Sequence, residues 1–155
     1  MAGNDALRLQ FEPGSDWRYS GGGYVIAQMA LEDHLGKSLA DLAETYLFKP
    51  LGMNYSTMRQ PHEAGFLTNV AQAHDENGQI IRTGTPITPQ VAPSGLWSTP
   101  LDIAIFIIEF QRALAGQDTK VISQAVAQSV VDVVTLKVMG GWSMGWGQKS
   151  NLLYH

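Results

Sequence analysis

The sequence contains no cysteine, so serine hydroxyls are the first candidates for a nucleophile. Residues 141–145 (GWSMG) match the G-x-S-x-G motif, in which a serine is exposed at a sharp turn from a strand into a helix. Here a polar turn at residues 148–150 follows instead of a helical pattern, and only His155 comes later as a partner for Ser143. The spacing therefore favours a strand rich in glycine and tryptophan over a nucleophile at Ser143.

Two further candidates, a metal site and a phosphate site, are weaker. No two of the histidines have the four-residue helical spacing that zinc sites use, so we expect no metal site. The histidines are His34, His62, His74 and His155. The glycines at 21–23 precede a helical pattern and could cradle an anion, but no strand comes before them and no Lys-Ser or Lys-Thr pair follows. We interpret them as a tight turn, and we expect no cofactor.

The most informative stretch surrounds Tyr19, and three later segments accompany it in order. These four landmarks are residues 11–24 (FEPGSDWRYSGGGY), 48–53 (FKPLGM), 92–104 (APSGLWSTPLDIA) and the pair 145–147 (GWG) with 154–155 (YH). Together they resemble the serine β-lactamase-like hydrolases, a family that includes class C β-lactamases, penicillin-binding DD-peptidases and related esterases. Each landmark alone is weak, whereas their shared order over residues 11–155 is specific.

The resemblance implies acyl transfer by a serine, without a cofactor, on a small-molecule or peptide ester or amide. Tyr19 matches the tyrosine that acts as base or proton shuttle, and His155 matches the first residue of the family's His-x-Gly motif. Substrate-binding positions are implied at Ser20, Gly21 and Trp97. The plainer interpretations of these three are a tight turn at 20–21 and a core or cleft-wall role for Trp97.

Two departures limit what the resemblance implies. Gly21 stands where many members have asparagine, which favours an esterase or peptidase-like role over a β-lactamase. In addition, no serine or threonine has a lysine three positions later; the nearest cases, Ser15 and Ser56, lead to Arg18 and Arg59. Because arginine stays protonated, it cannot serve as the base. We therefore expect the nucleophilic Ser-x-x-Lys upstream of residue 1 and the end of His-x-Gly downstream of residue 155.

On this interpretation the 155 residues are part of a serine hydrolase domain and are inactive alone. The alternative is an inert helical module that acts as an interaction or assembly partner. The helical lobe would span about 11–135 and the strands returning to the sheet about 140–155. The fold class expected is α+β, mostly α-helical, with two C-terminal strands.

Helices are predicted where apolar side chains recur with helical spacing, between capping residues and glycines. They are expected at 24–35, from Ser38 to about 49, at 101–114 after Pro100, and from Ser123 to about 134, with strands at 140–147 and 151–154. The valine-rich end of the segment after Ser123 fits a strand equally well. Residues 52–97 are expected to be irregular, with a short hairpin at Asn77-Gly78. The helix at 101–114 is apolar almost all round and is expected to be buried.

Composition bounds the partners and the compartment. Charged residues make up 15% of the sequence, against about 25% in an average domain, and the net charge is −4. The absence of a basic cluster argues against nucleic acid. The longest apolar run has six residues, so no membrane span is expected, and the first ten residues do not resemble a signal peptide. The compartment stays open, although a periplasmic or secreted parent would suit the family. Low charge predicts exposed apolar surface and self-association.

Overall fold

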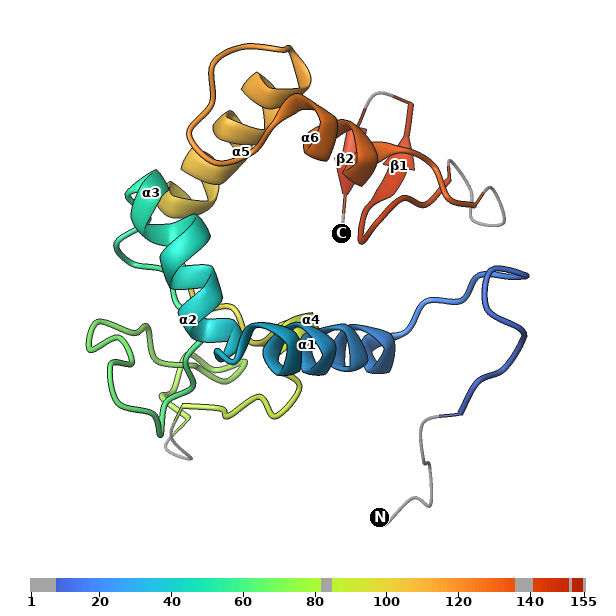
Figure 1. The fold of residues 1–155 in the computed structure, drawn as a ribbon. Helices are drawn as coiled ribbons and strands as arrows, with labels where there is room; N and C mark the ends of the chain where they lie inside the picture. Colours follow the sequence, from blue (N-terminus) through green and yellow to red (C-terminus); the bar gives the residue numbers. More distant parts are fainter. Residues whose placement is uncertain (1–7, 82–84, 136–140, 151, 155) are drawn as a thin grey trace. The chain divides into compact units, whose positions relative to one another are not determined.

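The computed structural model describes residues 8–81, 85–135, 141–150 and 152–154. Figure 1 shows the helices and strands in chain order, coloured from blue at the N-terminus to red at the C-terminus. The chain divides into two compact units. The first unit combines Met1–Tyr19 with Ala104–His155, and the second is Ser20–Ile103. Tyr19 and Ser20, neighbours in the sequence, therefore belong to different units.

The second unit begins with α1, Gly21–Leu35. The Ser20 hydroxyl accepts a hydrogen bond from the Gly23 amide (3.0 Å), and Gly36 ends the helix with a φ of 62°. The helix starts three residues earlier than predicted, and the interpretation of residues 21–23 as a tight turn is wrong. The cap at Ser20 satisfies an amide of the first turn, which lets the glycines begin the helix.

The next helical stretch consists of α2, Leu39–Ala43, a π-helical turn, Glu44–Phe48, and α3, Lys49–Leu51. As predicted, Ser38 caps it, accepting from the Asp41 amide (3.1 Å). The helix was expected to end near Lys49-Pro50 but continues to Leu51, after a π-helical turn that ends at Phe48, two residues before Pro50. Proline has no N–H for the regular helical bond, and a π-turn is a common local irregularity of such a helix.

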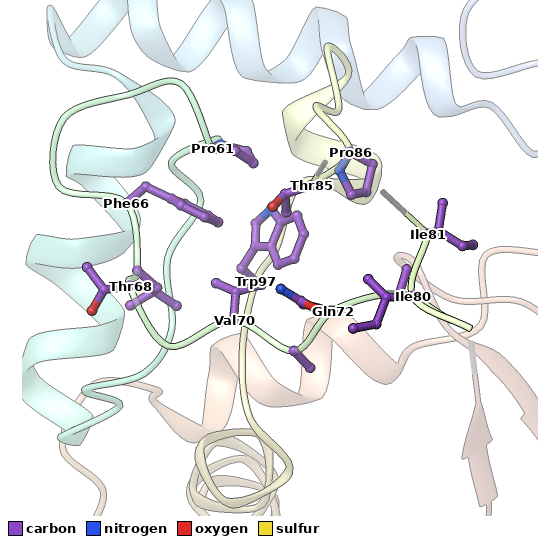
Figure 2. Close-up of a pocket in the computed structure, with 13 residues that line it drawn as sticks. Pro61, Phe66, Thr68, Val70, Gln72, Ile80, Ile81, Thr85, Pro86 and Trp97 are labelled. Atoms are coloured by element: carbon purple, nitrogen blue, oxygen red, sulfur yellow. The ribbon is translucent and has the colours of Figure 1, made fainter. Parts of the chain in front are cut away.

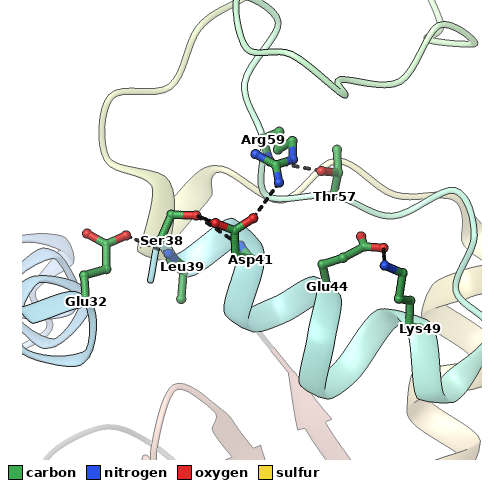
Figure 3. Close-up of polar contacts among 8 residues, drawn as sticks. All are labelled: Glu32, Ser38, Leu39, Asp41, Glu44, Lys49, Thr57 and Arg59. Carbon is green, nitrogen blue, oxygen red and sulfur yellow. Dashed lines mark hydrogen bonds and ion pairs between the residues drawn. The ribbon is translucent and has the colours of Figure 1, made fainter. Parts of the chain in front are cut away.

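A polar cluster ties the loop after this helix back to its first turn (Figure 3). The Asp41 carboxylate accepts from the Ser38 hydroxyl (2.8 Å) and pairs with Arg59 (2.6 Å). The Ser38 hydrogen bond, followed by Arg59, holds the pKa of Asp41 below its ordinary value. Upstream, the Glu32 carboxylate accepts from the Leu39 amide (2.7 Å), so the turn between α1 and α2 is fixed from both sides.

The described residues of the stretch 52–97, namely 52–81 and 85–97, are irregular, as predicted, apart from α4, Val91–Ser94. The turn expected at Asn77-Gly78 is present: Gly78 has a φ of 76°, and His74 and Ile80 form an isolated antiparallel bridge around it. The Asp75 carboxylate accepts from the amides of Asn77 (2.9 Å) and Gln79 (2.8 Å), which stabilises the turn locally.

Two helices form the core of the first unit. The helix α5, Pro100–Leu114, begins at the end of the second unit, and α6, Gln124–Val131, follows a Ser123 cap. Their contact buries Phe110, Ala113 and Ala127. Partly buried side chains pack around these three: Phe106, Leu114, Ile122, Val130 and Val131.

The prediction that the whole of α5 is buried is wrong. Leu101, Ile107 and Ile108 are exposed, because α6 covers only one face of the helix. Glu109 is buried instead and serves the loop before α6. Its Oε1 accepts from the backbone amides of Lys120 (2.6 Å), Val121 (2.8 Å) and Ile122 (3.4 Å).

The chain closes with two antiparallel strands, β1 at Gly147–Lys149 and β2 at Leu152–Tyr154. Gly147 pairs with Tyr154, Gln148 with Leu153, and Lys149 with Leu152. The expectation of a mostly helical α+β chain with two C-terminal strands is thus confirmed. The first strand was predicted at 140–147 but lies at Gly147–Lys149, so the two ranges share only Gly147, and the polar turn predicted at 148–150 is wrong because Gln148 and Lys149 belong to β1. Gly141 (φ 96°) and Gly145 (φ 81°) bend the backbone before this strand.

Candidate functional site

Tyr19, the predicted base, belongs to an aromatic cluster in the first unit, made of Trp17, Tyr19, Trp142 and Tyr154. Trp142 is its centre: its ring centroid lies 5.8 Å from that of Trp17, 5.7 Å from Tyr19 and 6.4 Å from Tyr154. Both tyrosines meet it edge to face, at interplanar angles of 85° and 90°. Each such contact contributes about 0.5–1.5 kcal/mol beyond area burial. The Tyr19 side chain is still 59% exposed, so it is held without being enclosed.

Backbone hydrogen bonds fix the position of Trp142. Its amide donates to the Thr135 carbonyl (2.9 Å), and its carbonyl accepts from the amides of Val134 (2.8 Å) and Thr135 (3.2 Å). It also forms a bridge with Gly147 at the start of β1. The ring at the centre of the aromatic cluster is therefore set by backbone geometry.

Gly147 makes room for the fourth ring. A Cβ atom at this position would overlap the ring of Tyr154, so the ring would have to shift to make room for it. Because glycine lacks that atom, the Tyr154 ring can lie over the backbone of the paired strand and reach Trp142. This gives a physical reason for glycine in the GWG landmark.

The other predicted catalytic residue, His155, lies outside the described residues. It directly follows Tyr154 in the sequence. The aromatic cluster therefore links Tyr19 to the residue that precedes His155.

Ser20 and Gly21, predicted to bind substrate, open α1. The Ser20 hydroxyl is engaged as the helix cap. A Cβ on Gly21 would lie 3.8 Å from Cβ of Pro93, an ordinary contact, so packing does not require glycine there. Ser20 thus has a local structural role as the helix cap, whereas the packing around residue 21 would also accept a side chain.

Ser143 does not fit a nucleophile elbow. Its side chain is buried, and its hydroxyl donates to the Trp146 carbonyl (3.1 Å) while its amide donates to the same carbonyl (2.8 Å). A strand, β1, follows at Gly147. The sequence-based preference for a structural role agrees with this geometry.

Trp97, the remaining predicted site residue, lines an open cavity of about 890 Å³ in the second unit, here called the Trp97 cavity (Figure 2). Its ring meets that of Phe66 edge to face, with centroids 5.4 Å apart. The lining is mostly apolar: Pro61, Phe66, Leu67, Thr68, Val70, Ala71, Gln72, Ala73, Ile80, Ile81, Thr85, Pro86 and Trp97. A second cavity of about 490 Å³ shares Leu67, Val70, Ala71 and Trp97 with it.

The backbone at Trp97 is held by a ladder to Thr57. The Thr57 amide donates to the Trp97 carbonyl (2.8 Å), and the Trp97 amide donates to the Thr57 carbonyl (2.9 Å). Next to this ladder, buried Asp102 accepts from the Tyr55 amide (2.8 Å) and the Ser56 hydroxyl (2.8 Å). The two segments on either side of the ladder are therefore also joined through a buried carboxylate.

Further buried polar side chains brace this wall. The Ser56 hydroxyl bonds to that of Ser98 (2.7 Å). The Gln60 amide group donates to the Gly95 carbonyl (2.9 Å), and its oxygen accepts from the Thr88 amide (3.0 Å). Sequence analysis missed Gln60 and the buried role of Asp102, because a polar residue in an irregular loop resembles a solvated one until its partners are known.

Within the described ranges, no three His, Cys, Asp or Glu side chains are grouped so that they could hold a metal ion. None of the helices in the described part of the chain has the length and apolar character needed to span a bilayer.

Comparison with solved structures defines the class of fold. The chain superposes on a D-stereospecific amidohydrolase from Streptomyces sp. (TM-score 0.63, 19% identity, 90% of this chain and 42% of that one). It is also similar to a β-lactamase/D-alanine carboxypeptidase from Pseudomonas syringae (TM-score 0.62, 20% identity, 91% and 38%). A third relative is the octameric penicillin-binding protein homologue from Pyrococcus abyssi (TM-score 0.61, 23% identity, 86% and 30%). The fold is that of β-lactamases and transpeptidases.

Sequence comparison gives the family. The β-lactamase family model matches residues 4–153, and the chain belongs to that family. Over 54 residues it is 43% identical to penicillin-binding protein 4* of Bacillus subtilis (strain 168). That match covers 35% of this chain and 12% of the relative. The resemblance predicted from the four landmarks is confirmed, and the chain spans less than half the length of each relative named here.

Proposed function

We propose that these 155 residues are part of a serine hydrolase domain that cleaves an ester or amide through an acyl-serine intermediate. The nucleophilic serine and its lysine would come from sequence outside the 155 residues. Tyr19 carries the proposal: it matches the tyrosine of the family motif in a chain that belongs to the β-lactamase family, and its exposed side chain contacts the aromatic cluster.

In this reaction the serine oxygen forms a bond to the substrate carbonyl carbon, and its proton passes to the Tyr19 phenolate, which the ammonium group of the motif lysine would stabilise. The C–O or C–N bond of the substrate then breaks, and the proton goes to the departing alcohol or amine. Water hydrolyses the acyl-serine in the second half, with the same proton relay reversed. His155 would border the cleft, as in the family motif that it matches.

The substrate class proposed is a small or peptide-like ester or amide. The Streptomyces relative is named a D-stereospecific amidohydrolase and the Pseudomonas syringae relative a β-lactamase/D-alanine carboxypeptidase, and the amide substrates that both names imply support this class. Gly21, in place of the asparagine common in the family, favours esters and peptides over β-lactams.

The test uses the complete protein that contains this chain, labelled with a fluorophosphonate and with penicillin. Tyr19→Phe should lower the rate of acylation by about 100-fold or more, the usual contribution of a general base. Tyr46→Phe is the matched control, because Tyr46 is similarly exposed and lies outside the aromatic cluster. Acylation of Tyr19→Phe at the unaltered rate would overturn the role of Tyr19.

A second candidate is an inert helical module that binds another chain or itself. Every residue of α1 is at least partly exposed, including Ile26, Met29, Leu31 and Leu35. Such a surface favours association. Size-exclusion chromatography of the 155-residue chain together with probe labelling separates the candidates. An unlabelled complete protein would favour the module, and a covalent adduct would exclude it.

A further inference from the structure

We propose that Trp142 is a positioning residue of the hydrolase: its ring orients the phenol of Tyr19, and it affects acylation through that tyrosine. The role in acylation rests on the proposed function. The orientation of the Tyr19 ring does not, and a separate measurement tests it.

Tyr19 needs support from outside its own segment. Residues 16–20 form neither helix nor strand, and the Tyr19 side chain is 59% exposed. An exposed tyrosine on irregular backbone has several staggered rotamers open to it. A proton transfer, by contrast, requires the phenol oxygen at hydrogen-bond distance from the group that it deprotonates. Contacts with residues distant in the sequence are therefore needed to select one rotamer.

Trp142 supplies such a contact, and the contact has a defined direction. Its ring meets the Tyr19 ring edge to face, at an interplanar angle of 85° with centroids 5.7 Å apart. The positive edge of one aromatic ring is attracted to the negative face of another, which favours this orientation over a face-to-face one. Rotation of the Tyr19 ring about its side-chain bonds would break the contact, so the indole favours one position of the phenol.

A second ring on the same segment strengthens the attachment. Trp17 also contacts Trp142, with centroids 5.8 Å apart and an interplanar angle of 48°. Trp17 and Tyr19 are two residues apart, a spacing that places side chains on one side of an extended backbone. The segment is therefore attached to a single indole at two points, which resists rotation of the segment as well as its displacement.

The indole is itself fixed by a distant part of the chain. Hydrogen bonds join its backbone to Thr135, and a bridge joins it to Gly147 at the start of β1. Tyr154 packs against it from β2, with centroids 6.4 Å apart. Trp142 thus connects the segment of the first landmark, which carries Tyr19, with the strands of the fourth.

The chemistry of tryptophan leaves positioning as the route by which Trp142 affects proton transfer. An indole has one N–H donor and no acceptor, so it cannot take the proton of a serine. The backbone carbonyl of Trp142 already accepts from the amides of Val134 and Thr135. Direct contact of the indole with the substrate is the alternative, and it gives a different result in the experiment.

The experiment measures the rate constant of acylation of the complete protein by a fluorophosphonate, with the final extent of labelling as the measure of active molecules. Trp142→Phe keeps an aromatic ring, whereas Trp142→Leu does not. The phenylalanine variant should stay within about threefold of the unaltered protein, and the leucine variant should be about 10–100-fold slower, because a displacement of about 1 Å is enough for such a loss. Equal rates in the two variants would overturn the proposal.

A double-mutant cycle shows whether Trp142 acts through Tyr19. In the Tyr19→Phe background, Trp142→Leu should slow acylation by less than about threefold, because the group that the indole positions is already absent. The same loss in both backgrounds would show that the indole acts independently of Tyr19, by contacting the substrate or by supporting the fold. That result would also overturn the proposal.

Phe106→Leu is the matched control for a loss of aromatic packing in the same unit. Phe106 stacks on Phe110 with centroids 6.1 Å apart, in the core of α5 and α6 and outside the aromatic cluster. This variant should lose stability but keep the acylation rate constant of the unaltered protein. A loss of rate as large as that of Trp142→Leu would show that acylation follows general stability, and would contradict the positioning role.

Fluorine NMR of the complete protein labelled with fluorotyrosine tests the orientation of the ring. The Tyr19 signal, identified by its loss in Tyr19→Phe, should move further in Trp142→Leu than in Trp142→Phe, because only leucine removes the ring that Tyr19 faces. A Tyr19 signal that does not move in Trp142→Leu would overturn the orientation of Tyr19 by Trp142, whatever the protein catalyses.

The unaltered protein separates this proposal from the hydrolase proposal. If it forms no acyl-serine, the hydrolase proposal fails, and the role of Trp142 in acylation fails with it. If it is acylated and both Trp142 variants react at its rate, the hydrolase stands and only the role of Trp142 fails.

Discussion

The aromatic cluster and the Trp97 cavity use tryptophan in opposite ways. Trp142 meets three other rings, and Gly147 removes the atom that would separate it from Tyr154. Trp97 meets the ring of Phe66 and otherwise borders a cavity. A tryptophan that contacts several rings holds its neighbours in place, whereas one that borders a cavity has fewer packing contacts.

The two regions also differ in what fixes them. The aromatic cluster depends on ring contacts and on backbone bonds of Trp142 to Thr135. The Trp97 cavity depends on buried polar side chains, chiefly Asp102 and Gln60, behind its wall. Ring contacts tolerate small shifts of the side chains. By contrast, the protein loses stability sharply when a buried carboxylate loses one of its hydrogen-bond partners.

The largest effect should come from emptying the centre of the aromatic cluster. Trp142→Ala removes three ring contacts and should lower the free energy of unfolding by about 3 kcal/mol. Trp97→Ala should lower it by no more than about 1.5 kcal/mol, because one face of that ring contacts solvent-filled space. Denaturant titration of both variants measures the free energy of unfolding. Equal losses in the two variants would contradict the distinction between a tryptophan that contacts three rings and one that borders a cavity.

Asp102→Ala should rank next. It leaves the Tyr55 amide and the Ser56 hydroxyl without their acceptor and should reduce the free energy of unfolding by about 2 kcal/mol. The backbone NMR chemical shifts of residues from Tyr55 to Trp97 should change in this variant, while those of Tyr154 should stay as in the unaltered chain. The matched control is Asp132→Ala, a change of an exposed carboxylate. Shifts confined to residue 102 would show that the wall does not depend on this carboxylate.

Gly147→Ala should disrupt the aromatic cluster more gently, by about 1–2 kcal/mol, because the Tyr154 ring must move away from the added Cβ. Near-ultraviolet circular dichroism should lose intensity from the aromatic cluster. Gly23→Ala serves as the control: its Cβ would lie 3.6 Å from Ser20, and alanine is a better helix residue than glycine. An unchanged aromatic spectrum in Gly147→Ala would argue against the close approach.

The smallest effect concerns pH. Burial alone raises the pKa of the Glu109 carboxyl, but hydrogen bonds from the amides of Val121, Lys120 and Ile122, aided by Arg112, outweigh it and hold the pKa below its ordinary value. The ionised carboxylate thus stabilises the fold at neutral pH, and this contribution is lost as the pH falls below about 4. Thermal unfolding from pH 7 to 3 should be less pH-dependent in Glu109→Gln. The same pH dependence of thermal unfolding in Glu109→Gln and in the unaltered chain would contradict the stabilising role of the Glu109 carboxylate.

Local signals in the sequence were sufficient for much of the fold. Ser38 and Ser123 cap the helices that they were predicted to cap, and Gly36 ends α1. Such signals work because a cap and its amide lie within three or four residues of each other. The landmark motifs were sufficient for the family for the same reason, since each is a short contiguous run. The predicted roles of Tyr19, Ser20, Gly21, Trp97 and His155 remain proposals.

Tertiary structure decided the surroundings of the site residues. Tyr19 and Trp142 are far apart in the sequence, and nothing near either residue specifies that their rings meet. The same holds for Asp102 and Ser56, and for the exposed face of α5, whose burial depends on how many partners pack against it. Sequence determined the helices, their caps and the family because those depend on neighbouring residues. Structure determined which tryptophan is covered and which lines a cavity, because that depends on packing between distant segments.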